Sequence, residues 1–262
     1  MQTNIVRQPI LNNNKQILGY EILYEENAAT VYGQGDAQAA NVIEDFLLQL
    51  DSDKFLEGQV AYLTFTPNLL LKNIPKLFTP SKLVIQIEDS SIVHPLAQRV
   101  IYRYKKQGYK VALSGFEFAP RFFQLMDVVD IIKIDFTRYQ DKAMENIVTV
   151  AKNFGKELIA YHVDCPEAYQ RVIELGIDNV QGSAVAQALS TNVSRIDHLQ
   201  SNFFHLVVAV TRDDPDIDEI ADIISRDVTL AYSLIKMCIR DSLCCCGIIS
   251  INKIVHGYTL FV

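Results

Sequence analysis

The stretch KVALSGFEFAPRFFQLMDVVDIIKID, residues 110–135, decides the fold of this chain. Two short apolar runs rich in β-branched residues, Val111–Leu113 and Val129–Ile134, flank a segment that can hold a helical turn. Runs of this length and composition are typical of strands that are buried on both faces, as they are in a parallel sheet. The stretch therefore predicts two neighbouring parallel strands of an α/β fold.

The ends of these two strands carry the candidate functional residues. The second run ends in Lys133-Ile134-Asp135. Because side chains alternate along a strand, Lys133 and Asp135 share a face at its C-terminal end. Parallel α/β barrels place their chemistry at that end of the strands. The first run ends at the same level in Ser114-Gly115, which carries no charge, so the predicted site is only partly furnished with reactive groups.

Composition limits the class of protein. The chain has 262 residues, of which 49% are hydrophobic and 21% charged, as in an ordinary soluble globular protein. The net charge of −7 argues against nucleic acid or an anionic membrane as the main partner. No apolar run approaches the roughly 20 residues that span a bilayer. The start, MQTNIVRQPI, lacks the build of a signal peptide, so we expect a cytoplasmic protein.

Cysteine usage points to the same compartment. Only Cys165 lies within the first 237 residues, and the other four cysteines lie in the last 25. A secreted disulfide scaffold would spread its cysteines along the chain. No cysteine and histidine pairing has zinc spacing, so the sequence predicts no structural metal.

Strand and helix patterns alternate along residues 1–193, which predicts a parallel sheet with right-handed crossovers. The predicted strands are Ile5–Ile10, Ile17–Tyr24, Val60–Phe65, Leu83–Ile87, Val111–Leu113, Val129–Ile134, Glu157–Tyr161 and Ile177–Val180. The main predicted helices are Asp36–Leu50, Pro95–Gln107, Asp141–Phe154 and Pro166–Leu175.

The connections select one architecture. The first two strands are joined by four residues, 12–15, and so short a connection makes an antiparallel hairpin. An open doubly wound sheet is the competing fold, but no Gly-x-Gly-x-x-Gly follows the first strand. We therefore expect an α/β fold of the (β/α)8 TIM-like barrel type, whose first strand pair is antiparallel.

The alternation ends near residue 194. His198–Val210, Ile217–Ile224 and Val228–Met237 have helical patterns, with Asp216 as a predicted N-cap. Residues 194–237 are thus predicted to be a partial all-helical unit. Residues 238–262 have neither the helical nor the strand period, and two interpretations of this tail stay open. Their three adjacent cysteines could carry acyl groups or a soft metal, or the tail is a frame-shifted, non-native terminus, which we prefer.

Four motifs resemble those of the EAL domain, the bacterial module that hydrolyses cyclic di-GMP. They occur in family order and at family spacing: Gln8-Pro9-Ile10, Gly19-Tyr20-Glu21-Ile22-Leu23, Lys133-Ile134-Asp135 and Gln181-Gly182. Asp214-Pro215-Asp216 and Ile224-Ser225-Arg226-Asp227 are similar to the start of an HDOD domain. The resemblance implies the two-domain arrangement of EAL-HDOD signalling proteins, with the second domain truncated.

The resemblance also implies a two-metal phosphodiesterase site using Mg²⁺ or Mn²⁺. Two dications about 4 Å apart repel each other by about 16 kcal/mol at an effective dielectric of 20, which only clustered carboxylates offset. Family positions retained here are Glu21, Lys133, Asp135 and Gln181. The metal-ligand positions of the family fall on Thr64, Gln86, Ser114, Gly115, Tyr161 and Asp164, most of which are uncharged.

These departures predict a degenerate site that holds no metal and needs no cofactor. Acidic Glu25 stands where the family has an arginine for phosphate. Lys133 is expected to be a structural lysine paired with Glu21 or Asp135, and Tyr161 to fill space that metal and substrate would occupy.

Three functions compete. The chain is a catalytically inactive regulator acting through protein–protein contacts, a receptor that binds cyclic di-GMP without cleaving it, or an active phosphodiesterase. The missing carboxylates weigh against the third, and Glu25 with Ser114-Gly115 weighs against the second. We therefore expect a protein partner in a signalling pathway, with self-association left open.

Overall fold

The computed structural model describes residues 2–24, 43, 55–117, 119–123, 125–138, 141–194, 200–212, 214–228 and 230–232. Apart from Ile43, the predicted helix Asp36–Leu50 lies outside these residues, as do Glu25 and the cysteine-rich tail. Within the described ranges, no helix is both long and apolar enough to cross a membrane.

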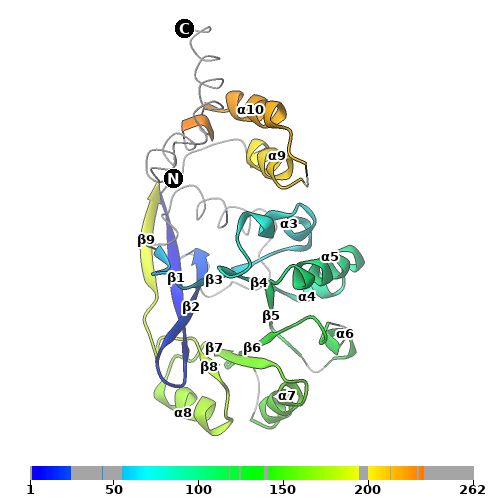
Figure 1. Cartoon of the computed structure of the whole chain (residues 1–262). Coiled ribbons are helices and arrows are strands. Elements are labelled where there is room, and N and C mark those ends of the chain that lie inside the picture. The colour runs from blue at the N-terminus through cyan, green and yellow to red at the C-terminus, as the bar shows by residue number, and fades with distance from the viewer. Residues whose placement is uncertain are drawn as a thin grey trace.

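A closed barrel forms the centre of the molecule (Figure 1). The described residues form one sheet with the order β2-β3-β4-β5-β6-β7-β8-β1-β9, which the pairing of β1 with β2 closes. Strands β2 to β8 are parallel, and β1 is antiparallel to both β2 and β8. The predicted barrel with an antiparallel first pair is confirmed. The strands are β1 (Gln2–Asn12), β2 (Ile17–Tyr24), β3 (Val60–Thr64), β4 (Leu83–Ile87), β5 (Lys110–Ser114), β6 (Ile131–Asp135), β7 (Glu157–Tyr161), β8 (Asn179–Val180) and β9 (Leu189–Ser194).

Strand β9 was not predicted. It runs antiparallel along the first half of β1, from the pair Gln2–Ser194 to the pair Arg7–Leu189. Its sequence, LSTNVS, is mostly polar, and Leu189 is 45% exposed, so no apolar alternation marks it as a strand. Two predicted strands also begin too early. The residues preceding β6 and β8 form turns and loop, where Asp130 accepts a hydrogen bond from the Val111 amide at 2.9 Å.

Helices lie around the outside of the sheet (Figure 1). Those that follow barrel strands are α3 (Pro67–Leu71), η2 (Ile74–Leu77), α4 (Asp89–Ile92), α5 (Pro95–Lys106), α6 (Pro120–Phe123), α7 (Asp141–Asn153) and α8 (Pro166–Glu174). Four of them, α3, α5, α6 and α8, begin with proline, whose fixed φ suits the first helical turn and whose missing N–H is not needed there. Thr66 and His94 cap α3 and α5 with side-chain acceptors.

Two apolar layers hold the barrel together. The larger layer lies between strands and helices, where α5 buries Ala97, Ile101 and Tyr104. The smaller layer fills the inside of the barrel, with one side chain from most strands: Ile10, Tyr62, Val84, Ala112, Ile131 and Ile159. Because side chains alternate along each strand, the inward-facing residue two positions further on lies one level higher inside the barrel.

Gly19 makes room for the largest side chain of the inner layer. A Cβ atom at Gly19 would lie 2.8 Å from the Tyr62 ring and 2.6 Å from the Val60 carbonyl oxygen. Gly19 and Tyr62 lie near each other on the neighbouring strands β2 and β3. The glycine of the Gly-Tyr-Glu motif therefore has a steric role in filling the barrel.

The C-terminal helices α9 (Gln200–Val210) and α10 (Ile217–Ser225) lie against each other (Figure 1). Asp216 caps α10 by accepting from the amides of the first turn, as predicted. Helix α9 also contacts η2, and Lys76 donates to the Thr211 carbonyl at 3.3 Å. Val207 joins the larger core layer of the barrel. The helical unit is therefore docked on the barrel through α9.

Candidate functional site

A ring of polar side chains lies at one end of the barrel, one level above the inner apolar layer. We call it the polar ring and define it as Gln8, Glu21, Thr64, Gln86, Ser114, Lys133, Tyr161 and Gln181. Five of these residues stand two positions after a residue of the inner layer, so the strand period places them inside the barrel: Thr64, Gln86, Ser114, Lys133 and Tyr161. The ring occupies the C-terminal ends of the parallel strands, where such folds place functional groups.

A buried ion pair spans the centre of the polar ring. Lys133 Nζ lies 2.9 Å from Glu21 Oε1, and the two side chains are 0% and 4% exposed. The partners come from β6 and β2, which are not neighbours in the sheet, so the pair crosses the inside of the barrel. Of the two partners expected for Lys133, the structure places Glu21 beside it.

Gln86 connects three members of the ring. Its Oε1 accepts from Lys133 Nζ at 3.0 Å, and its Nε2 donates to Glu21 Oε1 at 2.7 Å and to Thr64 Oγ1 at 2.9 Å. A carboxylate at position 86 would accept the lysine bond but could not donate to Glu21. The neutral amide therefore suits a ring whose only anion is already paired.

Gln181 completes the shell of Glu21 from the opposite side. Its Nε2 donates to Glu21 Oε2 and, at 2.9 Å, to Gln8 Oε1. Both carboxylate oxygens of Glu21 thus have donors. Within the described ranges, two buried atoms of the ring, Gln181 Oε1 and Ser114 Oγ, have no hydrogen-bond partner. The hydrogen bonds of the ring therefore satisfy Glu21 fully but do not extend to Ser114.

Charge states follow from these contacts. Burial would raise the pKa of Glu21, but the Lys133 charge and the three side-chain hydrogen bonds outweigh it and hold that pKa below its usual range. Burial lowers the pKa of Lys133, and the negative charges of Glu21 and Glu88 oppose that effect. Glu88 was missed by the sequence analysis. Its signal is its place immediately after the buried strand β4.

Tyr161 and Asp135 define the β6–β7 side of the site. The Tyr161 ring centroid lies 5.4 Å from Lys133 Nζ, a cation–π distance. Asp135 accepts from Thr137 Oγ1 at 2.7 Å and lies 3.1 Å from His162 Nδ1. Burial would raise the pKa of Asp135, but the Thr137 and His162 hydrogen bonds lower it. Asp135 is therefore engaged outside the ring rather than with Lys133.

Of the remaining predicted positions, Asp164 and Gly115 lie apart from the ion pair. Asp164 is exposed, and its Oδ1 accepts from the Ser183 amide at 2.8 Å and from Ser183 Oγ at 2.9 Å. Gly115 has a φ of 68° just after β5, where the chain turns. Ser114 pairs in register with Lys133 on the neighbouring strand. The structure thus brings together Glu21, Thr64, Gln86, Lys133 and Gln181, but not Asp135 or Asp164.

The donor set does not fit a pair of divalent metals. Mg²⁺ and Mn²⁺ bind oxygen ligands, above all carboxylates. Glu21 is the sole carboxylate of the polar ring, and Lys133 and two glutamine amides already occupy its oxygens. Across the part of the chain that the structure describes, no group of three acidic, histidine or cysteine side chains is placed to hold a metal ion.

Two sequence relatives match along most of this chain. It is 28% identical to the uncharacterized protein YuxH of Bacillus subtilis (strain 168) over 244 residues, covering 90% of this chain and 59% of YuxH. It is 22% identical to the cyclic di-GMP phosphodiesterase CdgJ of Vibrio cholerae over 239 residues, covering 89% of this chain and 55% of CdgJ. The chain thus spans less than two thirds of each of these relatives.

The fold is similar to that of solved EAL structures. One is the Bacillus subtilis YkuI protein, with an EAL domain, in complex with substrate c-di-GMP and calcium. It matches with a TM-score of 0.54 and 18% identity, covering 73% of this chain and 57% of YkuI. The EAL domain family model matches residues 26–188, which is more than half of the sequence. The polar ring therefore stands at the strand ends of a chain that belongs to the EAL domain family.

Proposed function

We propose that this chain is a catalytically inactive EAL protein that regulates cyclic di-GMP signalling through protein–protein contacts. The observation that carries the proposal is the buried ion pair between Lys133 Nζ and Glu21 Oε1 at 2.9 Å. In this arrangement the one carboxylate of the polar ring is neutralised by the chain's own lysine. A metal that used Glu21 would have to displace that lysine and leave an unpaired ammonium group inside the barrel.

The energetic cost of displacing Lys133 also disfavours a metal at Glu21. Removing one partner from a buried ion pair typically costs about 3–5 kcal/mol. A dication at Glu21 would impose that cost on Lys133, which is fully buried. The neutral side chains of Thr64, Gln86 and Ser114 would not repay it, because hard dications need anionic oxygens. An ordered two-metal centre is therefore disfavoured in this ring.

The contact role rests on the C-terminal helices. Ile217, Val228 and Tyr232 are 57%, 70% and 58% exposed. A contiguous exposed apolar patch is typical of an interaction surface, and we propose that these side chains belong to one. We propose that residues 194–237 are an HDOD-like unit joined to the EAL barrel of residues 1–193. In this proposal the protein works in the cytoplasm, and the partner is a protein of a signalling pathway or a second copy of the chain.

A second candidate function is supported by the residues that the ring retains. Glu21, Lys133 and Gln181 stand together at the strand ends, as the family resemblance expects. A relative, CdgJ, is named as a cyclic di-GMP phosphodiesterase. In this second proposal the ring would bind cyclic di-GMP without cleaving it, and the chain would be a receptor.

Isothermal titration calorimetry with cyclic di-GMP separates these proposals. We expect no saturable binding, with or without Mg²⁺, because the ring is filled by its own hydrogen bonds. Metal-independent binding that Glu21→Gln leaves intact and Ser114→Tyr abolishes would replace the contact role with the receptor role. Binding that requires Mg²⁺ and is lost with Glu21→Gln would contradict the inactive assignment.

A further inference from the structure

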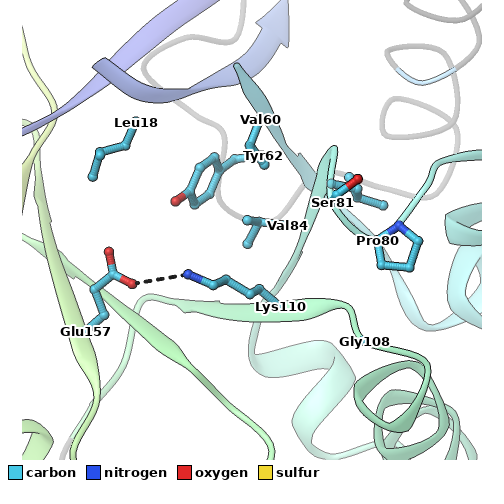
Figure 2. A pocket seen from close by; sticks show the side chains of 10 residues that line it. Leu18, Val60, Tyr62, Pro80, Ser81, Val84, Gly108, Lys110 and Glu157 are labelled. Atoms are coloured by element: carbon cyan, nitrogen blue, oxygen red, sulfur yellow. Dashed lines mark ion pairs between the residues drawn. The ribbon is translucent and has the colours of Figure 1, made fainter. Parts of the chain in front are cut away.

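A pocket of about 520 Å³ opens at the end of the barrel opposite to the polar ring. Its apolar walls include Val60 and Val84, and its charged residues are Lys110 and Glu157 (Figure 2). These residues stand at or near the N-terminal ends of β3, β4, β5 and β7, whereas the polar ring stands at the C-terminal ends. The volume is in the range of small-molecule sites, roughly 300–1,000 Å³.

Tyr62 separates the pocket from the polar ring. It belongs to the inner apolar layer and is 5% exposed, and its ring fits against the bare backbone of Gly19. Figure 2 shows its hydroxyl directed toward Glu157. Burial raises the pKa of Tyr62, so the hydroxyl is a neutral group able to donate a hydrogen bond. The pocket therefore has an apolar floor with one polar atom.

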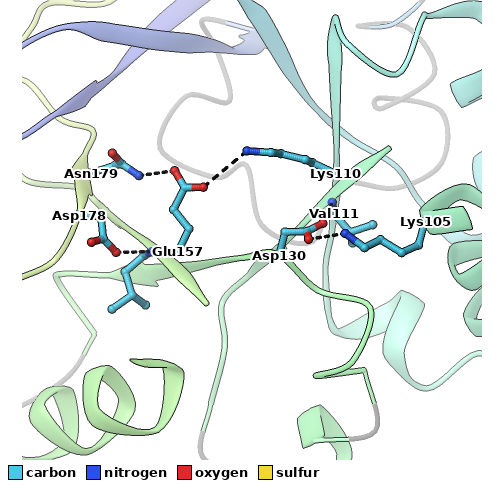
Figure 3. A network of polar contacts seen from close by, with 8 residues as sticks. Lys105, Lys110, Val111, Asp130, Glu157, Asp178 and Asn179 are labelled. Carbon is cyan, nitrogen blue, oxygen red and sulfur yellow. Dashed lines mark hydrogen bonds and ion pairs between the residues drawn. The ribbon is translucent and has the colours of Figure 1, made fainter. Parts of the chain in front are cut away.

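The charged side of the pocket presents one cation and one anion. Lys110 Nζ lies 3.8 Å from Glu157 Oε2, well beyond the roughly 2.7–2.9 Å of a charge-assisted hydrogen bond. Asn179 donates to the other oxygen, Glu157 Oε1, at 2.7 Å and so orients the carboxylate (Figure 3). The neighbouring Lys105 is directed to Asp130 instead (Figure 3). The loose pair leaves hydrogen-bonding capacity on both Lys110 and Glu157.

We propose that this pocket binds a free amino acid with an apolar side chain. The α-carboxylate would bind Lys110, the α-ammonium group would bind Glu157, and the side chain would lie on Val60 and Val84. A ligand with a carboxylate but no amine would lie next to the like charge of Glu157. A ligand with an amine but no carboxylate would lie next to the like charge of Lys110. A zwitterion satisfies both charges at once, and the aliphatic walls favour a leucine- or phenylalanine-like side chain.

Titration calorimetry of the full chain with L-leucine and L-phenylalanine tests this site. We expect saturable binding of at least one of them with one-to-one stoichiometry. Compounds that lack one charge, 3-phenylpropionate and 2-phenylethylamine, should bind at least tenfold more weakly than L-phenylalanine. The proposal is overturned if neither amino acid binds below about 10 mM, a free energy of roughly 3 kcal/mol. It is equally overturned if the singly charged compounds bind as well as L-phenylalanine.

Variants locate the binding. Lys110→Met should weaken amino-acid binding at least tenfold, and its side chain is 62% exposed, so folding should be retained. Glu157→Gln keeps the oxygen that accepts from Asn179 and should weaken binding similarly. The exposed Lys106, on the outside of α5, provides the matched control, and Lys106→Met should leave the affinity unchanged. Undiminished binding by both pocket variants would place the amino acid elsewhere and contradict the proposal.

Discussion

Replacing Lys133 by methionine is expected to lower the free energy of unfolding by roughly 3–5 kcal/mol. Methionine has a similar length but no charge, so Glu21 would remain buried at 3% exposure without its cation. Burial would then dominate and raise the pKa of Glu21. Because the folded state would prefer protonated Glu21, the deficit of the variant should shrink as the pH falls from 7 toward 5. Urea unfolding of both proteins across that range measures the effect.

The double variant Lys133→Met, Glu21→Gln is the decisive control. It removes both charges and keeps a carbonyl oxygen and an amide at position 21, so most of the stability lost in the single variant should return. Lys106→Met, at an exposed position, should change stability by less than about 0.5 kcal/mol. A single variant at Lys133 that loses less than about 1 kcal/mol would contradict the buried pair.

Replacing Gly182 by alanine should destabilise the barrel by about 4 kcal/mol or more, which is exceptional for one methyl group. A Cβ atom there would lie 2.2 Å from the Val163 carbonyl oxygen and 2.5 Å from the Val163 nitrogen. Val163 cannot move away freely, because its amide donates to the Gln181 carbonyl at 3.1 Å and its carbonyl accepts from Ala184 at 3.1 Å. Thermal and urea unfolding measure the loss.

Gly155→Ala is the matched control for Gly182→Ala. Gly155 has a φ of 64°, but a Cβ atom there would meet nothing within 4 Å. The control variant should therefore lose only the free energy of placing a side chain on a left-handed backbone, about 1–2 kcal/mol. If both variants lose the same stability, the close approach of Val163 is not what restricts position 182.

The fold was largely predictable because strand and helix periods agree with the connection lengths. Barrel strands that are buried on both faces are short runs rich in β-branched residues, as in Leu83–Ile87. This pattern can be recognised in a single sequence. Strand β9 was not predicted because its sequence is mostly polar, although it pairs with β1 along one edge. The limits of β6 could not be placed, because Val129 and Ile131 are equally apolar and only the Asp130 carboxylate marks where the ladder begins.

The site was predictable in composition but only partly in connectivity. Strand alternation places Lys133 on the inner face, and burial demands an anion for it, which left Glu21 and Asp135 as alternatives. The choice depends on His162, whose φ of 58° and ring position next to Asp135 arise from the loop after β7. The Gln86 bridge between Lys133 and Glu21 likewise depends on barrel closure, which no local pattern encodes.

Turnover of cyclic di-GMP tests the central claim most directly. The full chain, assayed with Mg²⁺ and separately with Mn²⁺, should release no linear dinucleotide above the background without protein, because Glu21 is held by Lys133 and the ring offers no second carboxylate. Product formation above background in either metal, abolished by Glu21→Ala, would show that the ring opens to a metal and would contradict the inactive assignment.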